Sequence, residues 1–536
     1  MRRAAILLLA LAGAPGTRPP ADTAPLKVML RALIPASGAA PRLVLEGQSF
    51  RASVALACFY QRRDFAPAWS DGSALQPRTG ELFAALAAAP DDGLRAEDYR
   101  LAALQRLAAA EHGNPSDLAE LDLLLSNAFL TFAGDLRNGK VNPAALYPDC
   151  ALGRDITDLA TILEEALQAN RVRPALAALA PPGPGYQMLR AALKRYRALA
   201  QQPGAAPVPP GSTLRLGDRG ERVAALRARL AEAADADNAP RSPLPAASPD
   251  LFDAPLAEAV RAFEARHGLE EDSVAGRGVL AEVNQQAADH VRQIEVNLER
   301  WRWLPHDLDG PIGPGILGRR HVLVNIAAFH LEAVEEGKTV LEMRVIVGKP
   351  YTRTPIFSSA MNAVVLNPSW SVPANIAAHE LFPKARKDPS YFQREGYEVL
   401  PGSRVRQKPG PKNALGRIKL VFPNRFDVYL HDTSAPALFG RTQRTFSHGC
   451  IRIEKPFDLA VWALRDDPRW TPEAIRAAID TGRERSVPLP AKIPVHVAYW
   501  TAWVGDDGVL RLGRDVYQRD AQLARLLAGT APKEAR

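Results

Sequence analysis

The feature of the sequence that most restricts the fold is a linker of proline, glycine and alanine at residues 201–212, QQPGAAPVPPGS. This composition is typical of a boundary between domains. The chain of 536 residues has the length of three or four domains, and its 47% hydrophobic residues are enough for several cores. We therefore expect separately packed domains on the two sides of the linker.

Residues 41–200, before the linker, are rich in leucine and alanine. Their apolar residues recur with helical periodicity and form few strand-like runs, so we expect a helical domain. Trp69 and Phe65 are expected in its core rather than on a binding surface. The lead-in, residues 15–40, is rich in proline and alanine and is predicted to be flexible.

Two helical runs follow the linker within residues 213–286. Their apolar residues each lie on one helix face: Val223, Leu226 and Leu230, then Leu256, Val260 and Phe263. Gly268 stands where the second helix should stop, because glycine adopts the left-handed conformation that commonly ends a helix. A small helical domain is predicted here.

The pattern changes to short alternating runs, such as HVLVNIAAFHL and EMRVIVGK, from residue 294 to about 485. These runs predict a mostly β domain, to which we assign residues 287–485. The C-terminal segment, residues 486–536, continues with strand-like runs and ends in a charged helical stretch. The expected fold class is multidomain α+β.

The first 14 residues have the features of a short secretory signal. Arg2 and Arg3 precede the apolar run AAILLLALAGA, and Ala10-Leu11-Ala12 fits a cleavage site. The run is too short to span a membrane. We expect an exported chain, with an ordinary apolar N-terminus as the alternative.

One of only three cysteines, Cys450, lies in the run TFSHGCIRIEKP at residues 445–456. In an extended strand, His448, Cys450 and Arg452 share one face, and the two isoleucines of the run point into a core. A thiol between two cations would have a depressed pKa and more of the reactive thiolate. Gly449 would let backbone N–H groups approach a reacting carbonyl oxygen.

A small buried cysteine in a core strand is the alternative for Cys450. A face that also carries serine, histidine and arginine is poor core material. The run therefore favours a nucleophilic cysteine.

Two histidines are candidates for the base that such a cysteine requires. His448 would lie about 6.6 Å from Cys450 with a parallel side chain, which suits a supporting role. His431 ends the alternating run NRFDVYLHDTSAP beside a polar loop, a common place for catalytic residues. A surface histidine at a strand end is the other reading, and spacing alone does not decide.

Several motifs between about residues 290 and 480 resemble the L,D-transpeptidase family of bacterial cell-wall enzymes. YLHDT and RTFSHGCIRIEKPFDLA are similar to its active-site signature, and PGPKNALGRIKLVFPN to the approach to that site. VNLERWRWLP, VIVGKPYTRTPIF and NPSWSVPANI resemble the larger Gram-negative members. Together these motifs are far more specific than any one of them.

The resemblance implies a role for each matching residue. Cys450 matches the nucleophile and His431 the base. The oxyanion and supporting residues are Ser447, His448, Gly449 and Arg452, and the substrate-binding candidates are Tyr429, Trp370 and Asn413. A purely packing role is the alternative for Trp370, and the role of Asp432 stays open. No cofactor and no metal are implied, and no CxxC or HExxH pattern exists to hold zinc.

The implied reaction removes the terminal D-alanine from a peptidoglycan tetrapeptide stem through a Cys450 thioester. Transfer of the acyl group to an amine would then make 3-3 cross-links. The implied partners are peptidoglycan stem peptides and carbapenem-type inhibitors, which acylate the family's cysteine. The implied location is the periplasm.

The other domains resemble further parts of the larger family members. Residues 41–200 are similar to a scaffold domain, 213–286 to a peptidoglycan-binding domain, and 376–412 to a capping insertion, with a surface loop as the alternative. Residues 237–250 look like an inserted loop, and Asp272-Ser273 replaces the usual Asp-Gly. Binding of glycan strands is therefore left open.

Alternatives to the transferase remain at this point. An L,D-carboxypeptidase or other cysteine peptidase would use the same Cys450 and His431, and a non-catalytic peptidoglycan-binding protein is the third reading. The acceptor and a disulfide between Cys58 and Cys150 also stay open. The net charge of +8 suits anionic cell-wall polymers; no nucleic-acid motif accompanies it, so no nucleic-acid partner is expected.

Overall fold

The computed structural model describes residues 23–35, 41–111, 114–240, 248–305 and 320–529. The predicted signal peptide, residues 1–14, lies outside the described residues. The chain divides into two compact units, with unit 1 comprising Met1–Ala87, Ala96–Ala133 and Thr157–Ala177, and unit 2 comprising Ala88–Arg95, Gly134–Ile156 and Ala178–Arg536. No helix in the described parts of the chain is long and apolar enough to cross a membrane.

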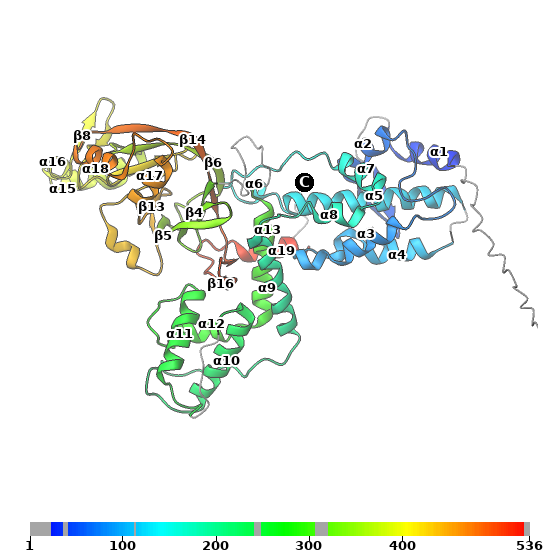
Figure 1. The fold of residues 1–536 in the computed structure, drawn as a ribbon, viewed down its shortest axis with the longest axis horizontal. Coiled ribbons are helices and arrows are strands. Elements are labelled where there is room, and N and C mark those ends of the chain that lie inside the picture. The colour runs from blue at the N-terminus through cyan, green and yellow to red at the C-terminus, as the bar shows by residue number, and fades with distance from the viewer. Residues whose placement is uncertain (1–22, 36–40, 112–113, 241–247, 306–319, 530–536) are drawn as a thin grey trace, which may run out of the picture. The chain divides into compact units, whose positions relative to one another are not determined.

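Unit 1 is mostly helical, as predicted (Figure 1). Its helices are α1 (Ala24–Leu33), α2 (Val54–Arg62), α3 (Arg78–Ala87), the 3-10 helix η2 (Ala96–Tyr99), α4 (Leu101–Ala109), α5 (Pro115–Asn138, whose end belongs to unit 2), α7 (Leu159–Gln168) and α8 (Val172–Ala177). A hairpin joins β1 (Arg42–Leu45) to β2 (Gln48–Arg51).

The predicted flexible lead-in is wrong for the stretch that forms α1. Leu26 and Leu30 lie one helical turn apart and are 2% and 0% exposed, so they anchor the helix by their burial. A proline in the first turn is compatible with helix initiation. The overall content of proline and alanine concealed this local pattern.

A buried polar network fixes the centre of unit 1. The Tyr60 hydroxyl and the Trp69 backbone N–H donate to the Asp122 carboxylate at 2.6 and 2.8 Å. The Trp69 indole donates to the Ser126 hydroxyl at 2.9 Å. These bonds satisfy groups that would be costly to bury unpaired. Trp69 is fully buried, which confirms its predicted core position, and Phe65 is half-buried.

The helices of unit 2 that precede its sheet are η1 (Ala89–Asp92, a 3-10 helix), α6 (Pro143–Leu146), α9 (Pro184–Ala200), α10 (Glu221–Asp237), α11 (Ala254–Arg266), α12 (Arg277–Val283) and α13 (Ala287–Arg302). Helices α9 and α13 pack side by side (Figure 1). The strand-like reading from residue 294 is wrong for α13. Ile294, Leu298 and Trp301 fall at i, i+4 and i+7, one helix face, and all three are buried.

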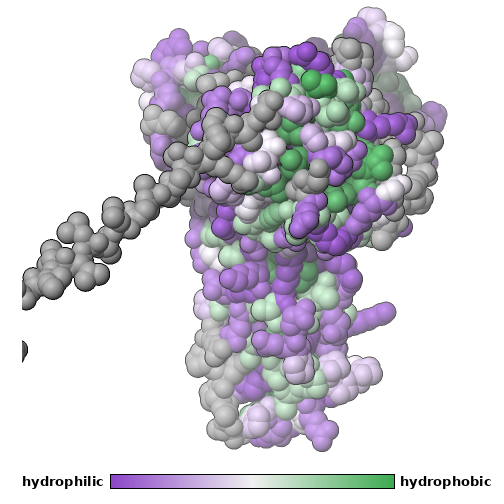
Figure 2. All heavy atoms as spheres, turned by 90° about the vertical axis from the view of Figure 1, so that its right-hand side faces the viewer, coloured by the Kyte–Doolittle hydropathy of each residue, from purple (hydrophilic) through white to green (hydrophobic). Residues whose placement is uncertain are grey.

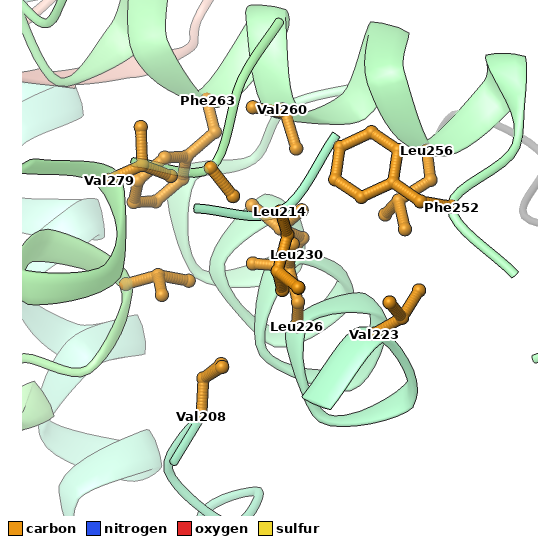
Figure 3. Close-up of a cluster of buried hydrophobic side chains, with 12 residues drawn as sticks. Val208, Leu214, Val223, Leu226, Leu230, Phe252, Leu256, Val260, Phe263 and Val279 are labelled. Atoms are coloured by element: carbon orange, nitrogen blue, oxygen red, sulfur yellow. The ribbon is translucent and has the colours of Figure 1, made fainter. Parts of the chain in front are cut away.

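Helices α10–α12 share a compact apolar core, shown in Figure 3. All six apolar residues predicted for its two helical runs belong to this cluster. Helix α11 ends at Arg266, and Gly268 adopts a φ of 61°, as predicted for a helix stop. The surface over these helices is mostly hydrophilic, as the lower part of Figure 2 shows.

The sheet of unit 2 is built from strands that span the predicted β domain and the C-terminal segment. They are β3 (Arg320–Asn325), β4 (His330–Glu335), β5 (Lys338–Gly348), β6 (Phe357–Leu366), β10 (Ile418–Val421), β11 (Leu430–His431), β12 (Thr445–Ser447), β13 (Ile451–Ile453) and β14 (Arg485–Ala498). Their order is β12-β5-β13-β11-β10-β6-β14-β3-β4, and a further β4–β5 pairing closes the sheet on itself.

Strand β14 lies inside this sheet, antiparallel to β6 and parallel to β3. The predicted boundary at residue 485 therefore cuts through the sheet, because alternation continues beyond it. The remaining elements of the described C-terminal part are α17 (Pro456–Leu464), α18 (Pro472–Asp480), β15 (Ala502–Val504), β16 (Leu510–Leu512) and α19 (Asp520–Leu527), with the 3-10 helix η4 (Pro436–Gly440) before them.

The predicted capping insertion forms a small layer with its own sheet. Its elements are β7 (Trp370–Val372), α14 (Ala374–Ile376), the π-helix η3 (Ala377–Leu381), α15 (Phe382–Lys387), α16 (Tyr391–Arg394), β8 (Tyr397–Leu400) and β9 (Arg404–Gln407). The strand order is β7-β9-β8. Its core contains Val372, Ile376, Ala377, Leu381 and Val405. This segment is therefore more than a surface loop, and its sheet begins at Trp370.

A matched pair of leucine substitutions tests the α10–α12 core. Leu226→Ala removes a fully buried side chain and should destabilise these helices by about 2–5 kcal/mol. Leu216→Ala, at a side chain that is 65% exposed, should leave them nearly unchanged. Amide hydrogen exchange of residues 221–283 measures the effect, and Leu226→Ala should lower protection about 30-fold or more. Equal protection in the two variants would contradict this core.

Candidate active site

The site is built on three adjacent strands of the closed sheet. His431 of β11 pairs with Lys419 of β10 on one side and with Arg452 of β13 on the other. Residues in register on neighbouring strands point to the same face of a sheet. Leu430 and Ile451, which alternate with them, are fully buried on the opposite face. The sheet therefore sets one imidazole between two cationic side chains.

Cys450 lies in a bend between β12 and β13, so the predicted continuous strand is wrong at this point. Gly449 interrupts the strand with a φ of 120°, a conformation that favours glycine. His448, Cys450 and Arg452 are therefore not simple neighbours on one strand face. The two isoleucines of the run are fully buried, as predicted.

Ser447 holds the bend closed from within. Its hydroxyl donates to the Cys450 carbonyl at 2.6 Å and accepts the Gly449 N–H at 3.1 Å. The Gly449 N–H is thus already engaged, which corrects the expectation that it would help to hold an oxyanion. The Cys450 N–H has no hydrogen-bond acceptor among the described residues, and it remains the donor available in this bend.

The Cys450 side chain is half-buried and its Sγ lies 3.8 Å from the Asp427 carbonyl oxygen. Burial raises the pKa of the Cys450 thiol, against hydrogen bonds from Tyr429 and the charge of Lys419, which lower it. The expectation of a depressed pKa is therefore wrong in this resting state. Desolvation outweighs the nearby positive charge, so the cysteine rests as a thiol.

His431 is 4% exposed, and among the described residues its Nδ1 has no hydrogen-bond partner. Burial, together with the positive charge of Arg452, lowers the pKa of His431 to about 3. A neutral imidazole can accept a proton, whereas an imidazolium cannot. The structure therefore places a neutral imidazole on the strand next to β13, which follows the cysteine. The alternative of a surface histidine does not hold, because the ring is buried.

The predicted binding residues Tyr429 and Trp370 meet beside the cysteine. The Tyr429 hydroxyl receives a hydrogen bond from Trp370 and makes one to Cys450. The Lys419 ammonium lies 3.8 Å from the centre of the Tyr429 ring, within the range of a cation–π contact. Trp370 and Tyr429 are both half-buried, so they form part of the wall next to the thiol.

Asn413 is 1% exposed and turns its side chain into its own loop. Its amide donates to the carbonyls of Pro368 and Lys408 at 3.0 and 2.9 Å, and its oxygen accepts the Leu415 N–H at 2.8 Å. These bonds use the amide fully. The structure thus places Asn413 in a positioning role for this loop rather than on an open binding surface.

His448 points to the insertion instead of to the base. Its Nε2 lies 2.6 Å from the Glu380 carboxylate on η3, and both side chains are partly exposed. This contact joins the bend of the cysteine to the capping layer. The supporting role of His448 in the reaction stays a prediction.

Asp432, whose role the sequence left open, fixes the loop before β10. Its carboxylate accepts the backbone N–H groups of Arg417 and Thr433 at 2.8 and 2.7 Å. A side chain at Gly416 would collide with this carboxylate, at 2.3 Å from its Cγ. The Asp432 carboxylate therefore acts on the backbone around His431.

Cys58 and Cys150 are free thiols in this structure, so the disulfide left open above is not formed. Burial raises the pKa of Cys150 to about 11. Within the described residues, no group of three or more His, Cys, Asp or Glu side chains could hold a metal ion.

Sequence reasoning missed Lys419 as a member of the site. The run Arg417–Val421 alternates, and Lys419 stands on its polar face between Ile418 and Leu420, which are buried. A lysine inside such a run was the available signal. Its position opposite His431 depends on strand register, which alternation alone does not reveal.

Two family models match the chain. One, described as a Scaffold domain, matches residues 54–193, and the other, an L,D-transpeptidase catalytic domain, matches residues 319–475. The second range contains every candidate site residue named above. The chain is also 32% identical over 252 residues to a Haemophilus influenzae protein named "Putative L,D-transpeptidase". That match covers 43% of this chain and 49% of the relative, so the chain spans about half the relative's length.

Solved structures of L,D-transpeptidases show lower similarity. One from Xylanimonas cellulosilytica is 17% identical and covers 54% of this chain and 98% of that chain, with a TM-score of 0.18. L,D-transpeptidase 3 from Mycobacterium tuberculosis, in complex with a faropenem-derived adduct, is 15% identical and covers 34% and 60%, with a TM-score of 0.19. Scores this low add no argument to the sequence matches.

The low pKa of His431 predicts a loss of stability in acid. Between pH 6.5 and about 3, the unfolded chain binds a proton on this histidine that the folded chain does not bind. The free energy of unfolding should therefore fall by about 1.4 kcal/mol per pH unit in that window through this group alone. His431→Asn removes this contribution. The free energy of unfolding of the wild type minus that of the variant should therefore fall with that slope as the pH falls.

Urea unfolding followed by tryptophan fluorescence, from about pH 7 to pH 4, measures the difference. His379→Asn, at an exposed histidine of the insertion, controls for loss of a surface imidazole. His496 is also buried, with its pKa lowered by burial to about 3, and it cancels because every variant retains it. A pH-independent difference between His431→Asn and the wild type would contradict the buried neutral imidazole.

Proposed function

We propose that this chain, whose residues 319–475 form a catalytic domain of the L,D-transpeptidase family, is a cell-wall acyltransferase with Cys450 as its nucleophile. Its donor would be a peptidoglycan tetrapeptide stem. The enzyme would break the bond between the L-configured centre and the terminal D-alanine, and would transfer the acyl group to an amine. The products would be 3-3 cross-links.

The observation that carries this proposal is the position of Cys450, in the glycine bend that leads into β13, beside the strand that holds the buried His431. Burial raises the pKa of Cys450 and lowers that of His431, so both rest uncharged. A buried thiolate–imidazolium pair would need two charges to be desolvated. In the proposed first step, the Cys450 proton passes to His431 as Sγ attacks the stem carbonyl carbon.

The attack places negative charge on the carbonyl oxygen. The Cys450 N–H, which has no acceptor of its own, is the donor that we assign to this oxyanion. Arg452 attracts the Cys450 sulfur when it is charged, which would favour proton transfer out of the thiol. Collapse of the intermediate breaks the carbon–nitrogen bond, His431 returns its proton to the D-alanine nitrogen, and the acyl group remains as a thioester on Cys450.

The second half of the reaction reverses the roles. An acceptor amine attacks the thioester carbon, His431 takes a proton from the amine, and the carbon–sulfur bond breaks. The sulfur leaves as a thiol after taking that proton back. Water in place of the amine would give an L,D-carboxypeptidase. Trp370 and Tyr429, which meet beside the thiol, are the proposed contacts for the stem peptide.

We also propose inhibitors, a glycan partner and a cellular location for this chain. Carbapenem-type inhibitors would acylate Cys450 by opening of their ring. Glycan strands are proposed only as a partner of the α10–α12 cluster. A cell-wall substrate requires export, so we propose a periplasmic location reached by the N-terminal signal peptide.

Intact-protein mass spectrometry with a disaccharide-tetrapeptide tests this function. The wild type should gain the mass of the donor minus D-alanine. Cys450→Ala should gain nothing, whereas Cys58→Ala, which removes another half-exposed thiol, should behave as the wild type. An adduct that survives in Cys450→Ala would place the acyl group elsewhere and overturn the assigned nucleophile.

Addition of an amine acceptor then separates transfer from hydrolysis. A new amide between donor and acceptor is the result expected for a transpeptidase. Free donor acid without amide would replace the proposal by a carboxypeptidase. No adduct and no turnover with folded protein would favour a peptidoglycan-binding protein without catalytic activity.

A further inference from the structure

The C-terminal segment, which the proposed chemistry does not use, reaches the bend of Cys450 through Tyr517. Tyr517 follows β16 and is 2% exposed. Its hydroxyl donates to the Gly348 carbonyl at 2.7 Å and accepts the Thr354 N–H at 3.1 Å. One phenol thus joins the two ends of the turn that follows β5.

Thr354 connects this turn to the bend of Cys450 through hydrogen bonds of its hydroxyl. Its hydroxyl accepts the Gly348 N–H at 2.9 Å and donates to the Gly449 carbonyl at 2.8 Å. Thr354 is fully buried. Gly348 must lack a side chain here, because a Cβ would lie 2.1 Å from the Thr352 carbonyl oxygen. The turn is therefore closely packed, and its geometry is transmitted to Gly449.

The Gly449 carbonyl and the Cys450 N–H belong to one peptide unit. This unit is planar and trans, so the N–H points opposite to the carbonyl oxygen. Holding the oxygen at Thr354 therefore fixes the direction of the Cys450 N–H. That N–H is the donor left free for an oxyanion.

Tyr517 is itself held in place by buried neighbours. Its backbone N–H donates to the Tyr499 hydroxyl at 2.8 Å, and that hydroxyl donates to Asp515 at 2.6 Å. The two tyrosine rings stack at 5.4 Å with an interplanar angle of 14°. The Arg519 guanidinium lies 5.4 Å from the Tyr517 ring centre. The backbone and the ring of Tyr517 are thus both held, which fixes its hydroxyl in space.

We propose that Tyr517 is a positioning residue for acyl transfer, which sets the direction of the Cys450 N–H through Thr354 and the Gly449 carbonyl. The inference rests on the proposed function, because it concerns the oxyanion of that reaction. It assigns a catalytic purpose to the C-terminal segment, which lies beyond residues 319–475 of the catalytic-domain match. Tyr517 supports the reaction without touching the reacting atoms.

Two reactions of the same thiol test this role in the full chain. A carbapenem acylates the cysteine by forming a sulfur–carbon bond and breaking the ring carbon–nitrogen bond, with the thiol proton ending on that nitrogen, and the attack creates an oxyanion. Iodoacetamide alkylates it by displacing iodide, with the thiol proton lost to buffer, and no oxyanion forms. Peptide mass mapping reports each modification at Cys450.

Tyr517→Phe should slow acylation by the carbapenem about tenfold or more, and should change alkylation by less than about twofold. Loss of a whole oxyanion donor slows catalysis about 10²- to 10³-fold, and a misdirected donor should have a smaller effect. Tyr196→Phe is the matched control, since it also removes a buried hydroxyl, bonded to Asp237 at 2.7 Å. It should leave both rates at the wild-type level.

If Tyr517→Phe is acylated at the wild-type rate, the inference about Tyr517 is wrong, but the proposed function stands. An equal fall of the acylation and alkylation rates would also refute the inference, because it indicates a merely structural role. A wild-type chain that is alkylated but never acylated would overturn the proposed function, and this inference with it.

A second pair of variants covers the case in which Tyr517→Phe does not fold. Thr354→Val removes the hydroxyl that holds Gly449, and Thr354→Ser retains it. The valine variant should show the selective loss of acylation, and the serine variant should recover most of it. A valine variant that acylates at the wild-type rate would refute the relay.

Discussion

The site depends on one constraint, the register of β11 between β10 and β13 in a closed sheet. This register sets the His431 imidazole between Lys419 and Arg452 and buries it. A shift by one residue would turn the imidazole to the face of Leu430, since side chains alternate along a strand. Closure of the sheet by the β4–β5 pairing removes free edges at this position, and the register is held from both sides.

Burial explains the chemistry better than the neighbouring positive charges do. Desolvation is the largest influence on the pKa of both Cys450 and His431, and it favours the neutral form of each. The pair therefore rests without charge. Charge would appear only as a substrate carbonyl is attacked, where Arg452 and the Cys450 N–H can stabilise it. In the proposed reaction, Ser447, Thr354 and Tyr517 would serve this step by fixing the bend, and Asp432 would serve it by fixing the loop beside His431.

The sequence predicted the helical part, the α10–α12 core and the mostly β part, because amphipathic spacing reports burial directly. The sequence-based prediction failed where side chains form hydrogen bonds with the backbone. The run before His431 alternates, yet only Leu430–His431 form a strand, because the Asn424 side chain accepts the N–H groups of Phe426 and Val428. The prediction of a continuous strand through Cys450 failed for a similar reason, because the Ser447 side chain bonds to the backbone of the bend at Gly449. Family signatures pointed to Cys450 and His431, whereas Lys419 and Tyr517 are joined to them only by register and by distant packing.

The protonation state of His431 in the resting protein tests the central claim most directly. Side-chain nitrogen NMR of histidine-labelled protein, assigned with His431→Asn, reports whether the ring is neutral or protonated. The neutral pair predicts a neutral imidazole from about pH 8 down to about pH 4, since the pKa of His431 lies near 3. An imidazolium near neutral pH that disappears in Cys450→Ala would show a thiolate–imidazolium pair, and would contradict the account.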